Sequence, residues 1–473
     1  MTPLALSRLP LRALLASAFV VLSLSSAAAV DVVIGQSGIS YQDPEIWNAG
    51  AKVAWQDENQ DVWLADLDPV TGVWIPASGR GTLLGRAAQI DDLEAGTWNG
   101  PEWGYSAAGP AVFFTAADAA GVHQVARYRL LTGTPGVPEF VTTGGSTPRR
   151  GVLPGKNLTD PQAPVMTFQG RFRANIGAWR YENEPTVDRL FPSTYFATSG
   201  PQWIPGDQAL ATNLDDANGT VQVVRYGLDG STTFLTTDAG HKFDTFFFQA
   251  PKLGGREMFI CTVSDIKPDT TVPETFNRLH VYGRTATGFE LVYVLTLTNF
   301  MPQTAVNHFS AEPFIFKGRT FFSLAVTLGA PYSSPSEVWV MNLPGTQAVR
   351  VSAPGAAARI DPESFVTTDR AFVYFYTVGT GGGRELHVCR DFMGAMSAPA
   401  STPVTVTPLS YTAGKFTLLL QSALPVRAGE IEASSDLVNW QSIGFHWPSL
   451  YRESAFVDWN AGAFPQRFYR MKP

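Results

Sequence analysis

Seven short phrases along the chain combine a proline with a glutamate or a glutamine. Four of these phrases carry a glutamate, at Glu45, Glu102, Glu312 and Glu363. The other three carry an amide, at Gln162, Gln202 and Gln249. Paired carboxylates are what glycoside hydrolysis needs, one as the acid and one as the base or nucleophile. The four glutamates are therefore the candidate catalytic residues, although a residue type that recurs at equivalent positions can equally well cap the start of a strand.

Aromatic residues near these phrases suggest a binding surface. In an extended strand, alternate side chains share a face, so Trp47 should point the same way as Glu45. An aromatic ring beside a carboxylate is suited to stacking on a sugar, and we predict Glu45 and Trp47 as ligand-binding residues. Trp103 and Trp203 directly follow Glu102 and Gln202, so they should face the other way, into the packing between sheets.

The histidines and aspartates predict no metal site. None of the six histidines shows an H-E-x-x-H pattern. His241 and His308 precede expected first strands, where the base or metal of a lyase could sit, but ordinary strand histidines are the alternative. The Asp-rich phrases at 66–72 and 213–220 lack EF-hand spacing and are more simply hairpin turns. No cofactor is predicted, and a structural calcium ion is left open.

The residues between the phrases have the pattern of β-strands. A second run follows each phrase, as in "SAAGPAVFFTA", "LGGREMFICTV", "FKGRTFFSLAV" and "TTDRAFVYFYTV". A third run follows it, as in "DVWLADLD", "HQVARYRLL", "VQVVRYGL", "RLHVYGR", "EVWVMNL" and "RELHVCRDF". Alternating β-branched and aromatic residues indicate strands, and Gly turns indicate hairpins. Phrases roughly fifty residues apart predict an all-β, seven-bladed β-propeller, with six blades as the alternative.

These motifs resemble those of the TolB-type (PD40-like) β-propellers over residues 40–400. The resemblance rests on P-E-W, a Gly-turned V-x-F strand, and a V-x-x-Y strand that ends in a Thr-Gly turn. The usual S-P-D-G turn is missing, and "IPGDQAL" is its nearest match. The resemblance implies an architecture and no site residue. In a propeller the first strand of each blade lines the channel, so the seven acidic and amide residues should form a ring near its mouth. Five-bladed glycosidases also carry an Asp-Pro early in the first blade, which makes "QDPEIW" comparable.

The two ends of the chain differ from its repetitive middle. Arg8 and Arg12, an apolar run and a small-residue end predict a signal peptide at residues 1–29, with Val30 as the mature N-terminus. A membrane anchor is the alternative, but the run is short, and no later segment is long enough to span a bilayer. Residues 30–396 are the predicted propeller, 397–408 a Pro-rich linker, and 409–473 a β-sandwich. The phrase "SSDLVNW" and the terminal "RFYR" resemble a small β-sandwich at the C-terminus of bacterial secreted proteins.

Composition limits the partners. Charged residues make up 16% of the chain, the formal net charge is −7, and basic clusters are absent, which argues against nucleic acid and anionic membranes. Cys261 and Cys389 either form a bridge or are two buried strand residues. We predict a secreted, periplasmic or cell-surface protein that binds a glycan or a cell-surface component at its channel mouth. A carbohydrate-active hydrolase or lyase and a structural envelope protein are the alternatives, so the sequence leaves open whether the protein is an enzyme.

Overall fold

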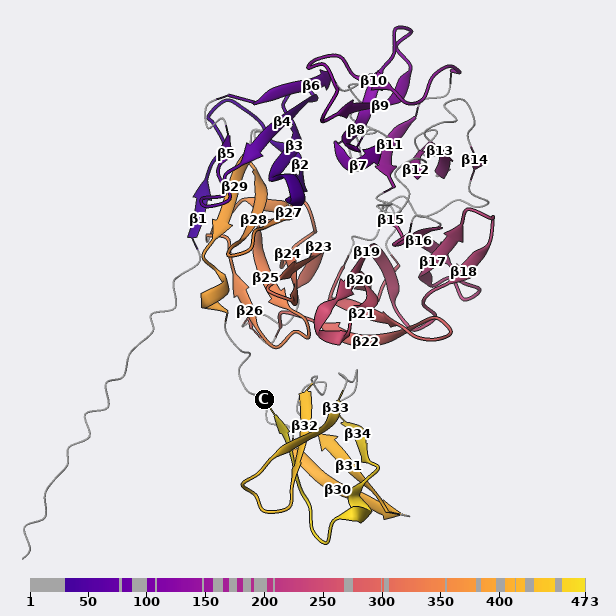
Figure 1. Cartoon of the computed structure of the whole chain (residues 1–473), viewed down its shortest axis with the longest axis vertical. Helices are drawn as coiled ribbons and strands as arrows, with labels where there is room; N and C mark the ends of the chain where they lie inside the picture. The colour runs from indigo at the N-terminus through magenta and orange to yellow at the C-terminus, as the bar shows by residue number, and fades with distance from the viewer. Residues whose placement is uncertain are drawn as a thin grey trace, which may run out of the picture.

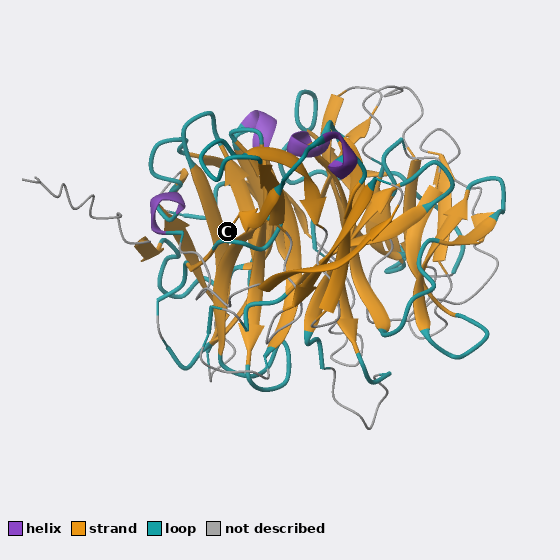
Figure 2. Ribbon diagram, turned by 90° about the horizontal axis from the view of Figure 1, so that it is seen from below, coloured by secondary structure: helices purple, strands orange, loops and turns teal. Residues whose placement is uncertain are grey.

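The computed structural model describes residues 30–75, 79–86, 100–106, 109–146, 149–155, 165–169, 177–181, 189–190, 202–206, 209–267, 275–298, 300–301, 306–353, 355–379, 384–396, 405–412, 414–421, 429–446 and 453–472. Strands dominate these residues, as Figure 2 shows. Their helical elements are single 3-10 turns, namely η1 (Asn48–Gly50), η3 (Pro251–Leu253), η4 (Met393–Ala395) and η5 (Ala461–Ala463). The all-β prediction is confirmed. The expected signal peptide at 1–29 lies outside the described residues.

Seven antiparallel sheets follow one another along residues 30–396 of the described chain. Sheet 1 contains β2 (Gln42–Trp47), β3 (Lys52–Gln56), β4 (Asp61–Leu67), β5 (Trp74–Ile75) and β6 (Thr82–Arg86). Sheet 2 contains β7 (Glu102–Ser106), β8 (Gly109–Ala117), β9 (His123–Arg129) and β10 (Glu139–Phe140). Sheet 3 contains β11 (Arg150–Pro154), β12 (Val165–Gln169), β13 (Gly177–Tyr181) and β14 (Arg189–Leu190). Sheet 4 contains β15 (Gln202–Trp203), β16 (Ala209–Asp215), β17 (Val221–Gly227) and β18 (Thr232–Phe234).

The remaining sheets repeat the same order. Sheet 5 contains β19 (His241–Ala250), β20 (Arg256–Ser264), β21 (Arg278–Arg284) and β22 (Phe289–Leu295). Sheet 6 contains β23 (Asn307–Phe316), β24 (Arg319–Thr327), β25 (Ser336–Asn342) and β26 (Ala348–Arg350). Sheet 7 contains β27 (Ala358–Val366), β28 (Ala371–Val378), β29 (Arg384–Arg390) and, from the start of the chain, β1 (Val30–Val33). The second and third runs that the sequence predicted as strands are all strands.

The seventh sheet joins the two ends of this region. β1 pairs antiparallel with β29, where Val30 lies opposite Arg390, so the succession of sheets returns to its start (Figure 1). The first strands of neighbouring sheets contact each other in the pairs β2/β7, β7/β11, β15/β19, β19/β23, β23/β27 and β27/β2. Four-stranded antiparallel sheets arranged around a common axis are the architecture of a β-propeller.

Apolar side chains between neighbouring sheets hold the ring together. Phe248 of sheet 5 meets Phe322 of sheet 6 edge to face, with ring centroids 5.5 Å apart. Both belong to one buried cluster that extends over the two sheets. A second cluster, including Phe321 and Phe375, continues from sheet 6 into sheet 7. Sheet 6 therefore buries both faces against its neighbours, and the apolar runs of its second and third strands reflect this.

A β-bulge interrupts five of the first strands at the same place. It lies in β2, β11, β19, β23 and β27. A residue with left-handed backbone conformation sits at each bulge, with φ between 48° and 63°: Asp43, Gly151, Asp244, Ser310 and Asp361. Glycine adopts this conformation freely and aspartate tolerates it through local hydrogen bonding, which explains the glycine and the three aspartates found here.

The C-terminal residues form two three-stranded sheets. One contains β30 (Thr405–Thr412), β31 (Lys415–Gln421) and β34 (Glu453–Asp458), and the other β33 (Gln441–His446), β32 (Gly429–Ser434) and β35 (Phe468–Lys472). Leu418 and Leu420 of the first sheet share a buried cluster with Ile431 of the second. Residues 397–404 of the expected linker lie outside the described residues. Residues 405–408, the end of the expected linker, belong to β30.

Cys261 and Cys389 are both free and buried. This confirms the prediction of two buried strand residues over the alternative of a disulfide bridge. Within the described ranges, the structure contains no helix with the length and apolarity that crossing a membrane requires.

Candidate functional site: an acidic arc on the first strands

The bulges define which side chains occupy equivalent positions. The first paired residue after each bulge is Glu45, Leu153, Phe246, Glu312 or Glu363. β7 and β15 begin at the corresponding residue, Glu102 and Gln202. Two hydrogen bonds between neighbouring sheets agree with this alignment. The indole Nε1 of Trp103 donates to the backbone oxygen of Glu45 at 2.8 Å. In the same way, Trp203 donates to the backbone oxygen of Leu153 at 2.8 Å.

The alignment corrects one member of the predicted ring. β19 and β23 have the same order of buried and exposed residues, which aligns Phe246 with Glu312. Gln249 lies three residues further along β19 and is exposed, so its predicted place in the ring is wrong. The bulge of β19 at Asp244 has no proline beside it. Pro251 is the first residue of η3, after the end of β19, and its position close to Gln249 resembles the Pro-containing phrases of the other sheets.

The glutamates occupy one side of the ring. β23, β27, β2 and β7 contact one another in that order, and they carry Glu312, Glu363, Glu45 and Glu102. On the other side, β11 and β19 carry Leu153 and Phe246. Gln162, predicted for that side, lies outside the described residues. The structure thus brings all four candidate glutamates together as an arc, and we call them, with Asp43 and Asp361, the acidic arc.

Glu363 is the buried member of the acidic arc, with 8% of its surface exposed, while the other five are half-buried. Burial raises the pKa of Glu363 well above its usual range, and the charges of Glu312 and Glu45 raise it further. The side chain of Glu312 also acts on Glu363 through hydrogen bonding, which raises the pKa of Glu363 in the same direction. These effects together favour the protonated form of Glu363.

The two aspartates of the bulges extend the same system. Burial raises the pKa of Asp43 to about 6, against the opposing charge of Arg384. Burial also raises the pKa of Asp361 well above its usual range, and the charge of Asp43 adds to this. Arg384 lies over the ring of Tyr376, 5.0 Å from its centroid, and places one cation beside the two aspartates. A Cβ at Gly100 would overlap Oδ2 of Asp43, so sheet 2 has glycine where sheets 1 and 7 have aspartate.

The acidic arc therefore presents both hydrogen-bond donors and acceptors. A protonated carboxyl donates, an ionised carboxylate only accepts, and a guanidinium only donates. No three His, Cys, Asp or Glu side chains in the described part of the chain are grouped so that they could hold a metal ion.

Trp47 packs between sheets 1 and 2. Its ring lies 5.3 Å from that of Trp103 and covers Gly50, where any Cβ would collide with it. The equivalent residues of sheets 6 and 7, Phe314 and Phe365, are buried core residues. We therefore assign Trp47 to packing instead of the ligand stacking that strand alternation predicted. Trp103 is 6% exposed, which confirms its predicted place in the core.

A buried basic side chain precedes the left-handed residue by two positions in four first strands. These residues are Arg149, Lys242, His308 and Arg359. Each donates to a backbone carbonyl oxygen, at 2.8 to 3.4 Å. Because Nε2 of His308 accepts the N–H of Leu297 at 2.9 Å, both ring nitrogens are engaged, and burial lowers the pKa of His308 to about 4. The prediction that His308 could be a base or metal ligand is wrong.

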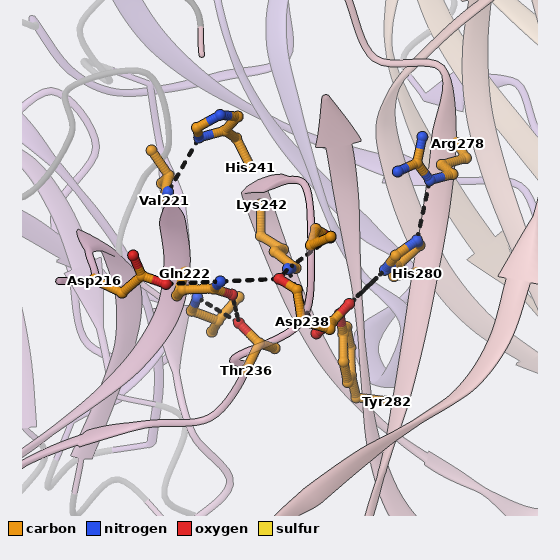
Figure 3. A network of polar contacts seen from close by, with 12 residues as sticks. Asp216, Val221, Gln222, Thr236, Asp238, His241, Lys242, Arg278, His280 and Tyr282 are labelled. Carbon is orange, nitrogen blue, oxygen red and sulfur yellow. Dashed lines mark hydrogen bonds and ion pairs between the residues drawn. The ribbon is translucent and has the colours of Figure 1, made fainter. Parts of the chain in front are cut away.

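Figure 3 shows the surroundings of this basic residue in sheet 5. Nζ of Lys242 lies 3.4 Å from the carboxylate of Asp238, which also accepts a hydrogen bond from the hydroxyl of Tyr282 at 2.8 Å. Burial acts to raise the pKa of Asp238, but the hydrogen bond from His280 and the charge of Lys242 bring it down to about 2. Nearby, Nδ1 of His241 accepts the backbone N–H of Val221 at 3.1 Å. These contacts join sheets 4 and 5 and explain His241 as a structural residue.

The Asp-rich phrases are hairpin turns, as predicted. Oδ1 of Asp68 accepts the backbone N–H of Val70 at 2.7 Å. Oδ1 of Asp216 accepts the N–H groups of Asn218 and Thr220 at 2.8 and 3.0 Å. These backbone hydrogen bonds lower the pKa of both carboxyls. The turns explain both phrases without a calcium ion.

Comparison with known proteins gives likeness to β-propeller structures alone. No family model and no curated protein matches the chain. The propeller domain of Cps50 (Swd1) from Myceliophteria thermophila shares 10% identity with a TM-score of 0.46, over 76% of this chain and 99% of that one. The propeller domain of the Trilobed protease from Pyrococcus furiosus shares 12% identity with a TM-score of 0.41, over 77% and 98%. A protein of Agrobacterium tumefaciens assigned to TolB shares 14% identity with a TM-score of 0.33, over 56% and 84%.

Proposed function

We propose that residues 30–396 form an exported seven-bladed β-propeller that binds an extracellular glycan, or a cell-surface partner that displays one, at its channel mouth. Residues 409–473 are an accessory β-sandwich in this proposal. Seven sheets and the pairing of β1 with β29 support the seven blades. β1 consists of Val30–Val33, so cleavage after Ala29 would keep the closing strand in the mature chain.

The acidic arc is the observation that carries the proposed binding function. Sugar hydroxyl groups both donate and accept hydrogen bonds, and the acidic arc offers both kinds of partner. Ionised carboxylates accept hydrogen bonds from hydroxyl groups, while a protonated Glu363, which its raised pKa favours, can donate to a ligand oxygen. Arg384 supplies a further donor beside Asp43. A polyhydroxylated ligand matches this set better than a simple anion, which the net negative charge of the acidic arc would repel.

We place binding ahead of hydrolysis in this proposal. Hydrolysis requires an acid and a base or nucleophile separated by the reacting bond. Burial and neighbouring charges raise the pKa of both Glu363 and Asp361 well above the usual range, which suits these carboxyls to exchanging hydrogen bonds with hydroxyl groups.

A glycan array with the secreted protein tests the proposal. Replacing Glu312 or Glu363 with Gln should weaken glycan binding about 10- to 100-fold, because one charge-assisted hydrogen bond contributes about 1.5–3 kcal/mol. Glu290→Gln is the matched control, since Glu290 is exposed and pairs with Arg256 in sheet 5, away from the acidic arc. Reducing-end and unsaturated-product assays run on every bound glycan. Absence of binding, or equal binding by the Glu363→Gln variant, would contradict the proposal, and release of new chain ends would establish the hydrolase or lyase alternative.

A further inference from the structure

A cavity of about 910 Å³ lies on sheet 6, and no member of the acidic arc lines it. β24 ends and β25 begins at this cavity, and the segments that lead into β23 and β27 complete its wall. Its volume is in the range of roughly 300–1,000 Å³ that is typical of small-molecule pockets.

The wall combines a large apolar surface with one polar edge. Phe300, Met301, Leu328 and Trp339 supply aromatic and aliphatic surface. Leu328 is 60% exposed, so apolar surface is open to solvent at the rim of the cavity. Ligand pockets generally show this combination of apolar walls and a few placed polar groups, which fix the orientation of the ligand.

The polar edge is held in place by its own hydrogen bonds. One carboxylate oxygen of Glu337 accepts the indole N–H of Trp339 at 3.1 Å. The other accepts an N–H of Arg350 at 2.9 Å, so both acceptor atoms of Glu337 are engaged. A guanidinium has five N–H donors, and the Arg350 side chain is 40% exposed, so it retains donors for a ligand. This edge therefore favours a ligand that carries a hydrogen-bond acceptor, and the apolar wall favours a ligand that carries a flat ring.

We propose that this cavity binds a small amphiphilic aromatic molecule with one acidic or carbonyl group. The ring lies against Trp339 and the apolar wall, and the acceptor group hydrogen-bonds to Arg350. Because Glu337 already neutralises the guanidinium, the apolar contacts provide most of the affinity, and the acceptor fixes the orientation. This binding site is independent of glycan recognition by the acidic arc.

Fluorescence titration of the full secreted chain with 1-anilinonaphthalene-8-sulfonate tests the proposal, since this probe carries an aromatic body and one sulfonate. We expect one saturable site. Leu328→Glu places a like charge at the rim and should weaken binding at least about fivefold, as removal of an anchoring contact does. Arg350→Gln removes the cation and should weaken binding by a similar factor. Leu131→Glu is the matched control, because Leu131 is 73% exposed on sheet 2, outside the cavity, and this variant should bind as the parent does.

Leu328 and Arg350 are both substantially exposed, so neither variant should unfold the protein, and circular dichroism checks this. The proposal is overturned if the parent shows no saturable binding, or if Leu328→Glu and Arg350→Gln both bind the probe as tightly as the parent. Glu363→Gln, which tests the acidic arc, should leave the probe affinity unchanged. Loss of probe binding in that variant would also overturn the independence of the two sites.

Discussion

Replacing Asp43 with Asn should stabilise the protein at neutral pH and leave it unchanged in acid. The pKa of Asp43 is raised by burial from 3.8 to about 6, so the folded protein holds this proton to a higher pH than the unfolded chain does. A raised carboxyl pKa makes folding less favourable as the pH rises from the unfolded value through the folded one. The parent protein should therefore lose stability between about pH 4 and 6. Asparagine removes the titration and also tolerates the left-handed backbone, where φ is 50° at this position.

The expected gain follows from the size of the shift. A change of two pKa units corresponds to about 3 kcal/mol when it is fully expressed, at about 1.4 kcal/mol per unit. Asp43 is half-buried, so solvent screens part of this effect. We expect Asp43→Asn to raise the free energy of unfolding by about 1–2 kcal/mol at pH 7.5 and by nearly nothing at pH 4.

Urea denaturation at half-unit steps between pH 4 and 8 measures this difference. Asp118→Asn is the control with the opposite sign, because the backbone N–H groups of Val122 and Ala120 lower the pKa of Asp118. That variant should be less stable than the parent by a nearly constant amount across pH 4–8, because a lowered pKa places its titration below this range, whereas the gain of Asp43→Asn should grow as the pH rises. If the difference in the free energy of unfolding between the parent and Asp43→Asn does not change with pH, Asp43 does not have a raised pKa in the folded protein.

Four further predictions concern packing and processing. Trp103→Phe should cost about 1 kcal/mol through the hydrogen bond to Glu45, and Trp103→Ala about 3–5 kcal/mol through lost packing, both measured by urea denaturation; a Trp103→Phe variant as stable as the parent would contradict the contribution of the bond. Gly100→Ala should cost about 1–3 kcal/mol because its Cβ displaces Asp43, and adding Asp43→Gly should recover most of the loss if that contact is the cause. Limited proteolysis should cut first between residues 396 and 405 and release a C-terminal fragment of about 65 residues; early cleavage within 30–396 would speak against a closed ring. Mass spectrometry of secreted protein should find Val30, or a residue within a few positions, at the N-terminus, whereas an intact Met1 on a membrane-bound protein would rule out the signal peptide.

The strands of the ring could be predicted because their pattern is local. Alternating apolar residues between Gly turns mark β8 and β24 without any knowledge of their partners. The Asp-Pro phrases correctly marked the first strands of sheets 1 and 7, where aspartate takes the left-handed position and proline follows it. β1 was not predicted as part of sheet 7, because its partner β29 lies more than three hundred residues away and its four residues carry no turn signal.

The positions of the site residues depend on the β-bulge of each first strand, and only some of these bulges have a proline beside them. The bulge requires a left-handed residue and not a proline, so Asp244 and Ser310 fill it without one. In β19 the nearest proline is Pro251, which led the alignment to Gln249 instead of Phe246. A basic residue two positions before the left-handed one, such as Lys242, was the sequence signal that could have located the bulge.

The packing of Trp47 against the neighbouring sheet was not anticipated for a related reason. Strand alternation says which face of its own sheet a side chain occupies, but in this ring both faces are covered by neighbouring sheets. Whether a residue is buried then depends on the adjacent sheet, and Trp103 from sheet 2 is the residue that covers Trp47. That contact is set by the arrangement of sheets around the ring, and no local pattern encodes it.

Other sheets of the same ring show which residues can replace the glutamates of the acidic arc. At the position of the four glutamates, sheets 3 and 5 carry Leu153 and Phe246, so an apolar side chain fits this backbone. Apolar residues at this position would avoid the cost of burying a carboxyl and the repulsion between carboxylates, the two effects that raise the pKa of Glu363. A chain under selection for stability alone would have no physical reason to keep carboxyls at this position in the first strands of four neighbouring sheets, since replacing buried charges with apolar residues is often stabilising. Departures of this kind from the rules of stable packing are expected at functional sites, and this is why we place the ligand at the acidic arc.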